Sequence, residues 1–437
     1  MELCEWAQKN ESARQYAHFD LKVSLKNVWS YISNPNNVVK HGFYPFIQYE
    51  RKYIKYSKKG KKEKTRKLCY SAHIDRYIYS YYGYLLNQKY NKYMAKRNID
   101  MVSVAYRDNL RKNNIHFAKH AFDFIKETDK CMIIIGDFSD FFDSLDHVYL
   151  KQRMCELIEK ERLPADYYAI FKNITQYSTW NLIDLLKLNG LKDTVKDRKI
   201  LNSKNRVLSK GDFKRYVKEY SIKNKEICGI PQGSAISAVL ANIYMIKIDE
   251  EINELITQYN GLYMRYSDDF IIVLPEKTEE GLENILFEIQ EKIKVAKLTL
   301  QEDKTKKYRY ENYTVKNCNG CKNEIDYLGF SFDGENITIR DKTISKYYYR
   351  LYRKIKTIEK RQGYTIKGKR ISCKNLYEHY SIKGAYLKGE NGRVKGNFLT
   401  YVKRAQKIFG EQESINSKSK RHMLKIRRKL DKVFKKI

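Results

Sequence analysis

Hydrophobic and polar positions follow two different periods along this chain, and the period changes from one segment to the next. An apolar residue at every third or fourth position predicts helices over residues 72–94, 114–126, 144–158, 238–252 and 279–296. Continuous or alternating apolar runs predict strands over residues 101–105, 131–137, 298–305 and 325–332, and a hairpin over residues 261–274. Residues 341–437 carry lysines and tyrosines in helical spacing, which predicts a basic helical region. The pattern as a whole predicts interleaved helices and strands.

Two adjacent acids occupy the turn of the predicted hairpin. Tyr266–Asp269 has the sequence Tyr-Ser-Asp-Asp and lies between an apolar-aromatic run and the β-branched run over residues 270–273. Adjacent carboxylates in an apolar frame repel each other and resist desolvation, so they need a cation, for which a divalent metal ion is the best candidate. The alternative interpretation is an ordinary Asp-Asp turn in a surface hairpin.

A third acid, Asp137, ends the predicted strand over residues 131–137. An apolar run followed by Gly-Asp indicates a buried strand that places Asp137 at its C-terminal end. Asp137 and the Asp268–Asp269 pair could meet on adjacent strands of one sheet. Three clustered carboxylates suit the two metal ions that in-line phosphoryl transfer requires.

A glycine-punctuated loop, Gly229–Ser234, precedes the predicted helix over residues 238–252 and has the sequence Gly-Ile-Pro-Gln-Gly-Ser. Its glycines let the backbone approach a ligand closely, and Ser234 and Ser237 add hydroxyl donors near the helix start. The loop is therefore a second candidate for ligand binding.

Three regions carry weaker signals. Residues 1–50 show helix-like periodicity with a break at residues 33–37, and no chemistry can be assigned to them. The basic run Lys58–Arg66 predicts either a solvated loop or a phosphate contact. Residues 160–227 contain Lys- and Asn-rich segments, which predict a basic insertion or extended loops rather than a separate core.

The charge of the chain narrows the class of partner. The 437 residues include 86 Lys and Arg against 52 Asp and Glu, a formal net charge of +34. This excess would repel itself in a compact fold, so we expect a polyanion as partner, with nucleic acid first and an anionic membrane second. No run of about 18 apolar residues occurs, so we expect no membrane-spanning helix. The N-terminal sequence does not resemble a signal peptide and the eight cysteines are scattered, which favours reduced thiols in the cytoplasm.

The order of these motifs adds a family resemblance. Asp137, Gly229–Ser234, Tyr266–Asp269 and the Leu-Gly-Phe sequence at Leu328–Phe330 together resemble the palm of reverse transcriptases, over about residues 60–340. The sequence is most similar to the bacterial group that includes retron, group II intron and defence-associated enzymes. Three further features carry that narrower likeness: Phe141-Phe142-Asp143, His147, and the pair Asp75-Arg76 that opens a predicted helix.

The resemblance implies an α+β right-hand polymerase fold, with fingers and palm of antiparallel sheet and helices and a basic helical thumb. The implied divisions are an N-terminal extension over 1–50, fingers over 51–130, a palm over 131–340 with a basic insertion near 160–227, and a thumb and C-terminal region over 341–437.

The resemblance also implies roles in the chemistry. Asp137 and Asp268 would bind two Mg²⁺ ions, for which Mn²⁺ is an alternative, with the Phe138 carbonyl as a further ligand and Asp269 completing the acidic cluster. Lys304 would lie near the leaving pyrophosphate as a general acid. The alternative for Lys304 is an ordinary surface lysine.

Further roles concern the nucleotide. Arg66 would contact the incoming triphosphate, with Lys64 or Lys67 as alternates. Phe142 would clash with a 2′-hydroxyl and so select dNTPs over rNTPs, unless it is simply a core ring.

The remaining roles concern the template and the primer. Gln232 and Gly233 would lie along the nascent base pair and the template, and Leu328–Phe330 would grip the primer backbone. His147 is expected to cap or pack locally rather than take part in the chemistry. The lone C-x-x-C at Cys318–Cys321 favours a turn between strands over a zinc site, because no further ligands lie nearby.

The implied function is that of an RNA-directed DNA polymerase that binds dNTPs, copies a structured non-coding RNA and holds the RNA/DNA hybrid. The signatures of typical retron enzymes and a C-terminal endonuclease constellation are absent from this sequence. We therefore expect a stand-alone defence-associated reverse transcriptase, of the type 2 kind that copies a companion RNA. The alternatives are a group II intron maturase, a retron-type enzyme, a catalytically silent RNA-binding protein, and synthesis primed by a tyrosine. Ser267 stands where many relatives have a small apolar residue, and the sequence does not explain it.

Overall fold

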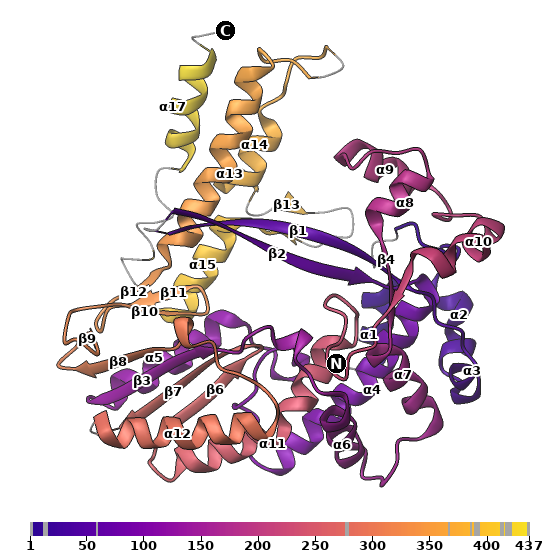
Figure 1. Cartoon of the computed structure of the whole chain (residues 1–437). Coiled ribbons are helices and arrows are strands. Elements are labelled where there is room, and N and C mark those ends of the chain that lie inside the picture. Colours follow the sequence, from indigo (N-terminus) through magenta and orange to yellow (C-terminus); the bar gives the residue numbers. More distant parts are fainter. Residues whose placement is uncertain are drawn as a thin grey trace.

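The structure is a computed structural model of the chain, and it confirms the α+β class, with helices and strands interleaved throughout (Figure 1). It describes residues 3–11, 16–57, 60–275, 279–365, 368–384, 387–388, 394–410, 415 and 422–434. Within that part of the chain, no helix is both long enough and apolar enough to cross a membrane.

The largest sheet is five-stranded and antiparallel, with the strand order β6-β7-β3-β8-β9. Its strands are β3 (Cys131–Asp137), β6 (Leu262–Tyr266), β7 (Asp269–Pro275), β8 (Lys306–Glu311) and β9 (Thr314–Asn317). The predicted strand over residues 131–137 and the predicted hairpin over residues 261–274 are therefore confirmed. Both consist of apolar runs because both faces of the sheet are covered.

Each face of this sheet packs into its own core. Met132 and Ile134 face the first core, whereas Cys131 and Ile133 face the second, as expected when side chains alternate along a strand. The first core is built with helices α4 (His73–Lys96), α6 (His147–Ile158), α11 (Ser237–Thr257) and α12 (Glu279–Val295). The second core is built with α5 (Asn114–Glu127), α15 (Phe398–Phe409) and the small sheet β10 (Ile325–Tyr327), β11 (Phe330–Phe332) and β12 (Ile337–Ile339).

A long hairpin of β1 (Phe46–Ser57) and β2 (Gly60–Tyr70) belongs to a second sheet, with the order β2-β1-β4-β5. The short strands β4 (Ser178–Asn181) and β5 (Ser221–Lys223) complete it. The hairpin is drawn in Figure 1 as a long ribbon that leaves the region of β4.

Residues 160–227 were predicted as a basic insertion or extended loops rather than a separate core, and the structure contradicts the loops and the lack of a core. The segment forms helices α7 (Ala165–Thr175), α8 (Leu182–Leu188), α9 (Val195–Ser203) and α10 (Lys210–Tyr220). Trp180, Leu185 and Leu201 form a small separate core together with Phe19 and Ile47. Because part of this core comes from the N-terminal region, the apolar pattern of residues 160–227 is too sparse by itself to reveal it. The N-terminal region contains α1 (Leu3–Glu11), α2 (Leu25–Ile32) and α3 (Pro35–Val39).

Two predicted strands were also wrong. Residues 101–105 form a turn-rich segment with a single parallel bridge, Ser103 to Arg265, because the segment only touches the edge strand β6 before it turns at Tyr106. Residues 298–305 make one bridge, Leu300 to Phe138, and then form a 3₁₀ turn over Glu302–Lys304. The helix predicted from residue 144 begins at His147, because the Asp146 side chain accepts a hydrogen bond from the backbone N–H of Tyr149 and caps it.

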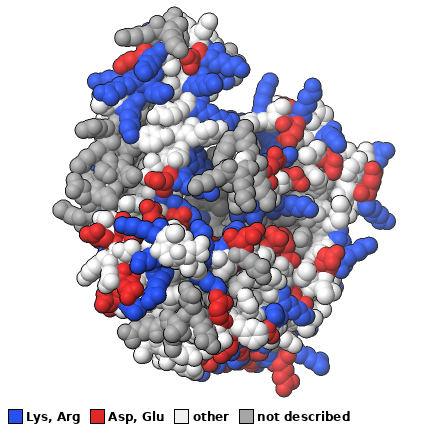
Figure 2. All heavy atoms as spheres, turned by 60° about the vertical axis from the view of Figure 1, so that its left-hand side comes forward, with Lys and Arg blue, Asp and Glu red and all other residues white. Residues whose placement is uncertain are grey.

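The C-terminal region is helical and basic, as predicted. Its described part contains the helices α13 (Asp341–Lys360), α14 (Lys374–Tyr380), α15 and α17 (His422–Phe434). A small unpredicted hairpin of β13 (Leu387–Lys388) and β14 (Val394–Lys395) lies between α14 and α15. Figure 2 shows Lys and Arg side chains gathered over the upper part of the molecule, where these helices lie.

Candidate active site

The β6–β7 hairpin presents the two adjacent acids at its turn, as predicted. Tyr266 pairs with Asp269 across the hairpin, so the turn itself consists of Ser267 and Asp268. Ser267 has a φ of +64° and is buried, whereas Asp268 is half-buried. The turn therefore holds Asp268 at the edge of the sheet.

Asp137 lies beside this turn, because β3 and β7 are neighbours in the sheet. Asp137 pairs with Asp269 at the end of the two strands, and the backbone N–H of Phe138 donates to the carbonyl of Asp268 at 3.3 Å. The structure thus brings the three predicted acids together on adjacent strands.

These acids influence one another electrostatically. Burial raises the pKa of Asp137, and the charge of Asp268 raises it further, while a hydrogen bond from Lys304 acts in the opposite direction. Asp269 is exposed to solvent, yet enough protein surrounds its carboxyl that burial and the charges of Asp268 and Asp137 raise its pKa to about 6. The site therefore holds more negative charge than its protein surroundings balance.

Lys304 is the cation that pairs with Asp137. The Lys304 ammonium donates to Asp137 Oδ2. The turn that carries Lys304 is tied to β3, because the backbone N–H of Lys304 donates to the Gln301 carbonyl and the backbone N–H of Gln301 donates to the Asp137 carbonyl at 2.8 Å. The predicted strand around Lys304 was wrong, but the lysine still lies at the acids. The Lys304 side chain is 37% exposed, and its part in the chemistry stays a prediction.

The donor set suits a hard divalent cation. Asp137 is 8% exposed, and its Oδ1 is buried without a hydrogen-bond partner in the described part of the chain. Carboxylate oxygens are the ligands that Mg²⁺ and Mn²⁺ prefer, and an unpartnered buried carboxylate oxygen is costly unless a cation satisfies it. Within the described residues, no three His, Cys, Asp or Glu side chains already converge on one point that would hold a metal ion. The fit therefore rests on the acids in combination with other oxygen ligands, such as water or a bound phosphate.

The long hairpin brings Lys64, the predicted alternate to Arg66, close to the acids. Lys64 lies close enough to lower the pKa of Asp137, whereas the Arg66 guanidinium lies over the ring of Tyr53, 5.9 Å from its centre. Lys67 lies near Asp143, whose pKa it lowers against the larger raising effect of burial. Residues 58 and 59 at the tip of the predicted basic loop lie outside the described residues.

The Gly229–Ser234 loop packs against the end of β2. The backbone N–H of Cys69 donates to the Gln232 carbonyl at 2.8 Å. Gly233 has a φ of +113°, and a Cβ there would lie 2.5 Å from the Cys69 carbonyl oxygen, so only glycine fits. Gly233 also borders a cavity of about 390 Å³, whose lining includes Tyr16, Tyr49, Tyr70 and Arg198.

Phe142 and His147 hold the same loop from its other side. The Phe142 carbonyl accepts from the backbone N–H of Ile230 at 2.9 Å, and its ring is half-buried, whereas the neighbouring Phe141 ring belongs to the core. The His147 ring hydrogen-bonds the Gly229 carbonyl through Nε2 at 2.8 Å, which agrees with the predicted local packing role.

Leu328–Phe330 forms the tight turn between β10 and β11, as predicted. Leu328 and Gly329 both have positive φ, and the Leu328 carbonyl accepts from the Asn114 side chain at 2.9 Å. Phe330 is fully buried against Tyr401, so its ring faces the core. Cys318 and Cys321 lie exposed in the turn after β9, and the predicted turn between strands is therefore confirmed.

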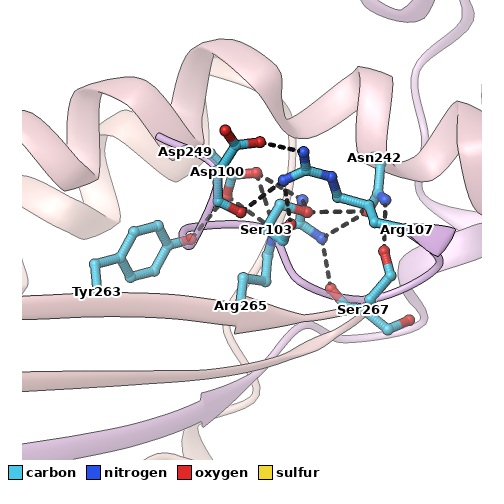
Figure 3. A network of polar contacts seen from close by, with 9 residues as sticks. Asp100, Ser103, Arg107, Asn242, Asp249, Tyr263, Arg265 and Ser267 are labelled. Carbon is cyan, nitrogen blue, oxygen red and sulfur yellow. Dashed lines mark hydrogen bonds and ion pairs between the residues drawn. The ribbon is translucent and has the colours of Figure 1, made fainter. Parts of the chain in front are cut away.

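A buried polar network behind the Asp268 turn was not predicted (Figure 3). Arg265 and Asp249 form an ion pair in which both side chains are 0% exposed. Ser103, Asn242 and Ser267 hydrogen-bond the same guanidinium. A signal was present, because Arg265 interrupts an apolar strand and Asp249 interrupts an apolar helix, but nothing in the sequence pairs them.

Comparisons with known proteins agree on one family. The family profile described as "Reverse transcriptase (RNA-dependent DNA polymerase)" matches residues 83–332. The telomerase reverse transcriptase of Tetrahymena thermophila is 24% identical over 205 residues, which are 40% of this chain and 18% of that protein.

Solved telomerase structures are also similar to this chain, at lower sequence identity than the Tetrahymena protein. Apo telomerase from Candida tropicalis, truncated from its C-terminal domain, gives a TM-score of 0.42 at 12% identity, over 72% of this chain and 60% of that one. Telomerase from Candida albicans with a fragment of telomeric RNA gives 0.40 at 14% identity, over 96% of this chain and 66% of that one. The chain thus spans less than two thirds of each of these proteins, and similarity at this level does not extend their activity to it.

Proposed function

Because the chain belongs to the reverse transcriptase family, we propose that it is an RNA-directed DNA polymerase that copies a structured non-coding RNA into complementary DNA. The observation that carries the proposal is the meeting of Asp137, Asp268 and Asp269 at one sheet edge, where one buried carboxylate oxygen has no hydrogen-bond partner in the described chain. Such an edge suits the transfer of a nucleotidyl group.

The proposal divides the chain as a right hand. The hairpin β1–β2 and the helices beside it serve as fingers (51–130), the five-stranded sheet as the palm (131–340), and the basic C-terminal helices as the thumb (341–437), with residues 1–50 as an extension. Residues 160–227 then add to the palm a helical module whose core also includes Phe19 and Ile47.

In the reaction, the primer 3′-hydroxyl attacks the α-phosphorus of a dNTP, a P–O bond forms, and the bond to pyrophosphate breaks. Asp137, Asp268 and the Phe138 carbonyl would hold two Mg²⁺ ions, or Mn²⁺, which supply positive charge to the hydroxyl and the triphosphate, with Asp269 adding negative charge beside them. Lys304 gives a proton to the departing pyrophosphate oxygen, and its hydrogen bond to Asp137 supports this role.

Other residues bind and select the nucleotide. Lys64, the hairpin cation that acts on Asp137, binds the triphosphate together with Arg66. The half-buried Phe142 ring excludes a 2′-hydroxyl. Gln232 and Gly233, fixed against β2, lie along the nascent base pair.

Template and primer binding rest on charge and on one turn. A net charge of +34 favours a long contact with nucleic acid phosphates. The turn at Leu328–Phe330 supports the primer backbone.

We propose further that the template is a companion RNA and that the DNA serves in bacterial antiphage defence. The motif resemblance and the lack of retron and endonuclease signatures in this sequence support this finer assignment.

The test is dNTP incorporation by protein purified with the RNA that co-expresses with it, in the presence of Mg²⁺. We expect wild type to incorporate dNTPs and Asp268→Ala/Asp269→Ala to lose incorporation. Asp123→Asn, on helix α5, removes an acid that pairs with Lys119 and serves as the matched control. Equal incorporation by wild type and the double variant would refute the proposal.

Sequencing the bound RNA separates a companion-RNA polymerase from an intron maturase. A short hairpin-rich RNA supports a companion template, whereas an intron with splice junctions would make the protein a maturase.

A further inference from the structure

The turn that carries Asp268 adopts a backbone conformation that its sequence does not favour. Ser267, the first residue of the two-residue turn, has a φ of +64°, and Asp268 does not share the positive φ. Glycine is the residue that hairpins prefer at a first turn position with positive φ. A serine there needs support from the surrounding structure.

Two contacts from behind the hairpin provide that support. Arg265 Nη1 donates to the Ser267 carbonyl at 2.8 Å, and the hydroxyls of Tyr106 and Ser267 lie 2.9 Å apart. Ser267 is only 6% exposed and Arg265 is fully buried, so the contact between them is shielded from water, whereas the Tyr106 side chain is 46% exposed. The turn is therefore anchored through Ser267, and Asp268 beside it is half-buried.

Arg265 is itself fixed by a complete set of partners. Its Nε donates to Asp249 Oδ1 at 2.9 Å, and its Nη2 donates to Asp249 Oδ2 at 2.6 Å and to Ser103 Oγ at 2.9 Å. Figure 3 shows these side chains converging behind the turn. A planar guanidinium can engage a carboxylate and a carbonyl at once, which a lysine ammonium cannot do with the same geometry.

The same pair links the turn to the Gly229–Ser234 loop. Asp249 lies on α11, and that helix begins at Ser237, whose hydroxyl donates to the Pro231 carbonyl at 2.8 Å. One rigid helix therefore connects the loop to the Asp268 turn through Arg265.

Stability does not explain why these charges are buried. Replacing a buried ion pair by well-packed apolar residues is often neutral or stabilising, so its retention favours a geometric role. We propose that Arg265 and Asp249 are positioning residues, which hold the Ser267 carbonyl and thereby place Asp268 for metal binding. This inference rests on the function proposed above.

The first test compares wild type with the apolar double variant Arg265→Met/Asp249→Leu and with Arg265→Lys. We expect the double variant to keep its circular dichroism spectrum and its thermal midpoint within a few degrees. We expect its Mn²⁺ affinity, measured by electron paramagnetic resonance without nucleotide, to fall about tenfold. Misplacement by about 1 Å costs on the order of 100-fold, so we expect kcat to fall 10- to 100-fold while the dNTP KM changes less than threefold.

A matched control and a rescue separate positioning from general loss of structure. Asp75→Asn removes one charge of a buried pair with His41 that contacts neither β6 nor β7, and it should leave Mn²⁺ affinity unchanged. Ser267→Gly relieves the unfavourable φ, so Arg265→Lys/Ser267→Gly should regain at least threefold in Mn²⁺ affinity over Arg265→Lys alone.

The outcomes are distinct. A folded double variant with wild-type Mn²⁺ affinity and kcat would overturn the inference. If the double variant fails to fold, the absence of rescue by Ser267→Gly in the Arg265→Lys background would overturn it instead. If wild type binds Mn²⁺ but incorporates no dNTP, the proposed function fails, and the Mn²⁺ affinities of the variants still decide whether Arg265 positions Asp268.

Discussion

Two clusters of charge lie on opposite sides of one hairpin turn, and they are built in opposite ways. In front of the turn, three carboxylates share a sheet edge, and the ion pair that the described residues make to them is Lys304 to Asp137. Behind the turn, Arg265 and Asp249 are fully buried and every guanidinium nitrogen has a partner. An unbalanced cluster stores repulsion that a bound cation can relieve, whereas a balanced one fixes geometry. The comparison separates the groups that would do chemistry from the groups that would place them.

The most severe test of this comparison removes one charge from the front cluster, which consists of Asp137, Asp268 and Asp269. Asp268→Asn should reduce incorporation by about a thousandfold or more, because metal-ion stabilisation is worth several kcal/mol. The same variant should unfold at the same or a higher temperature than wild type, because it removes repulsion from the site. Primer extension and thermal unfolding measure the two effects, with Asp123→Asn as control. A loss of activity that merely follows a loss of stability would remove the distinction between the clusters.

Removing one charge from the back cluster, the pair Arg265 and Asp249, should instead destabilise the protein. Asp249→Asn leaves the Arg265 charge buried and only partly paired, which should lower the free energy of unfolding by about 3–5 kcal/mol. Urea unfolding monitored by tryptophan fluorescence measures this change. If Asp249→Asn and Asp268→Asn shift the unfolding midpoint in the same direction, the two clusters are not of different kinds.

The sequence predicted the front cluster well for a physical reason. The strand that ends at Asp137 and both strands of the 261–274 hairpin are covered on two faces, so each consists mostly of apolar residues and has an acid beside it. Local pattern is enough to find such strands. The family resemblance then supplied their order and roles.

The back cluster and the helical module at 160–227 depend on contacts that local pattern cannot show. Arg265 and Asp249 are 16 residues apart on different elements, and only the packing of α11 on β6 joins them. Trp180 similarly completes its core with Phe19 and Ile47 from the N-terminal region. Ser267 seemed anomalous because its explanation, the Tyr106 hydroxyl, lies 161 residues away in the chain.

A smaller effect should come from Lys304, the cation that forms an ion pair with Asp137 at the front. Lys304→Met should lower kcat by about 100-fold, within the range usual for a lost general acid, and it should raise the pKa of Asp137 further because its hydrogen bond is lost. Lys306→Met, at an exposed position two residues along, is the matched control. Single-turnover rates across pH measure the change. An unaltered rate for Lys304→Met would leave the lysine as a counter-ion of Asp137 with no part in proton transfer.

The smallest expected effect is the contribution of Asp269 to the pH dependence of stability. The pKa of Asp269 is about 6 in the folded protein, against about 3.9 for an ordinary aspartate in the unfolded chain. Between these values the folded state binds more protons than the unfolded state, so this group makes stability fall as pH rises from about 4 to about 6 and has no further effect above. Asp269→Asn removes that loss, and because the residue is exposed and therefore screened, the variant should be more stable than wild type at pH 7 by no more than about 1 kcal/mol. Urea unfolding with a chelator present, at pH 4 and at pH 7, should show the two proteins equal at the lower pH and different at the higher one. A gain of the same size at both values would mean that repulsion among the three acids does not produce it, and the front cluster would then be as balanced as the one behind the turn.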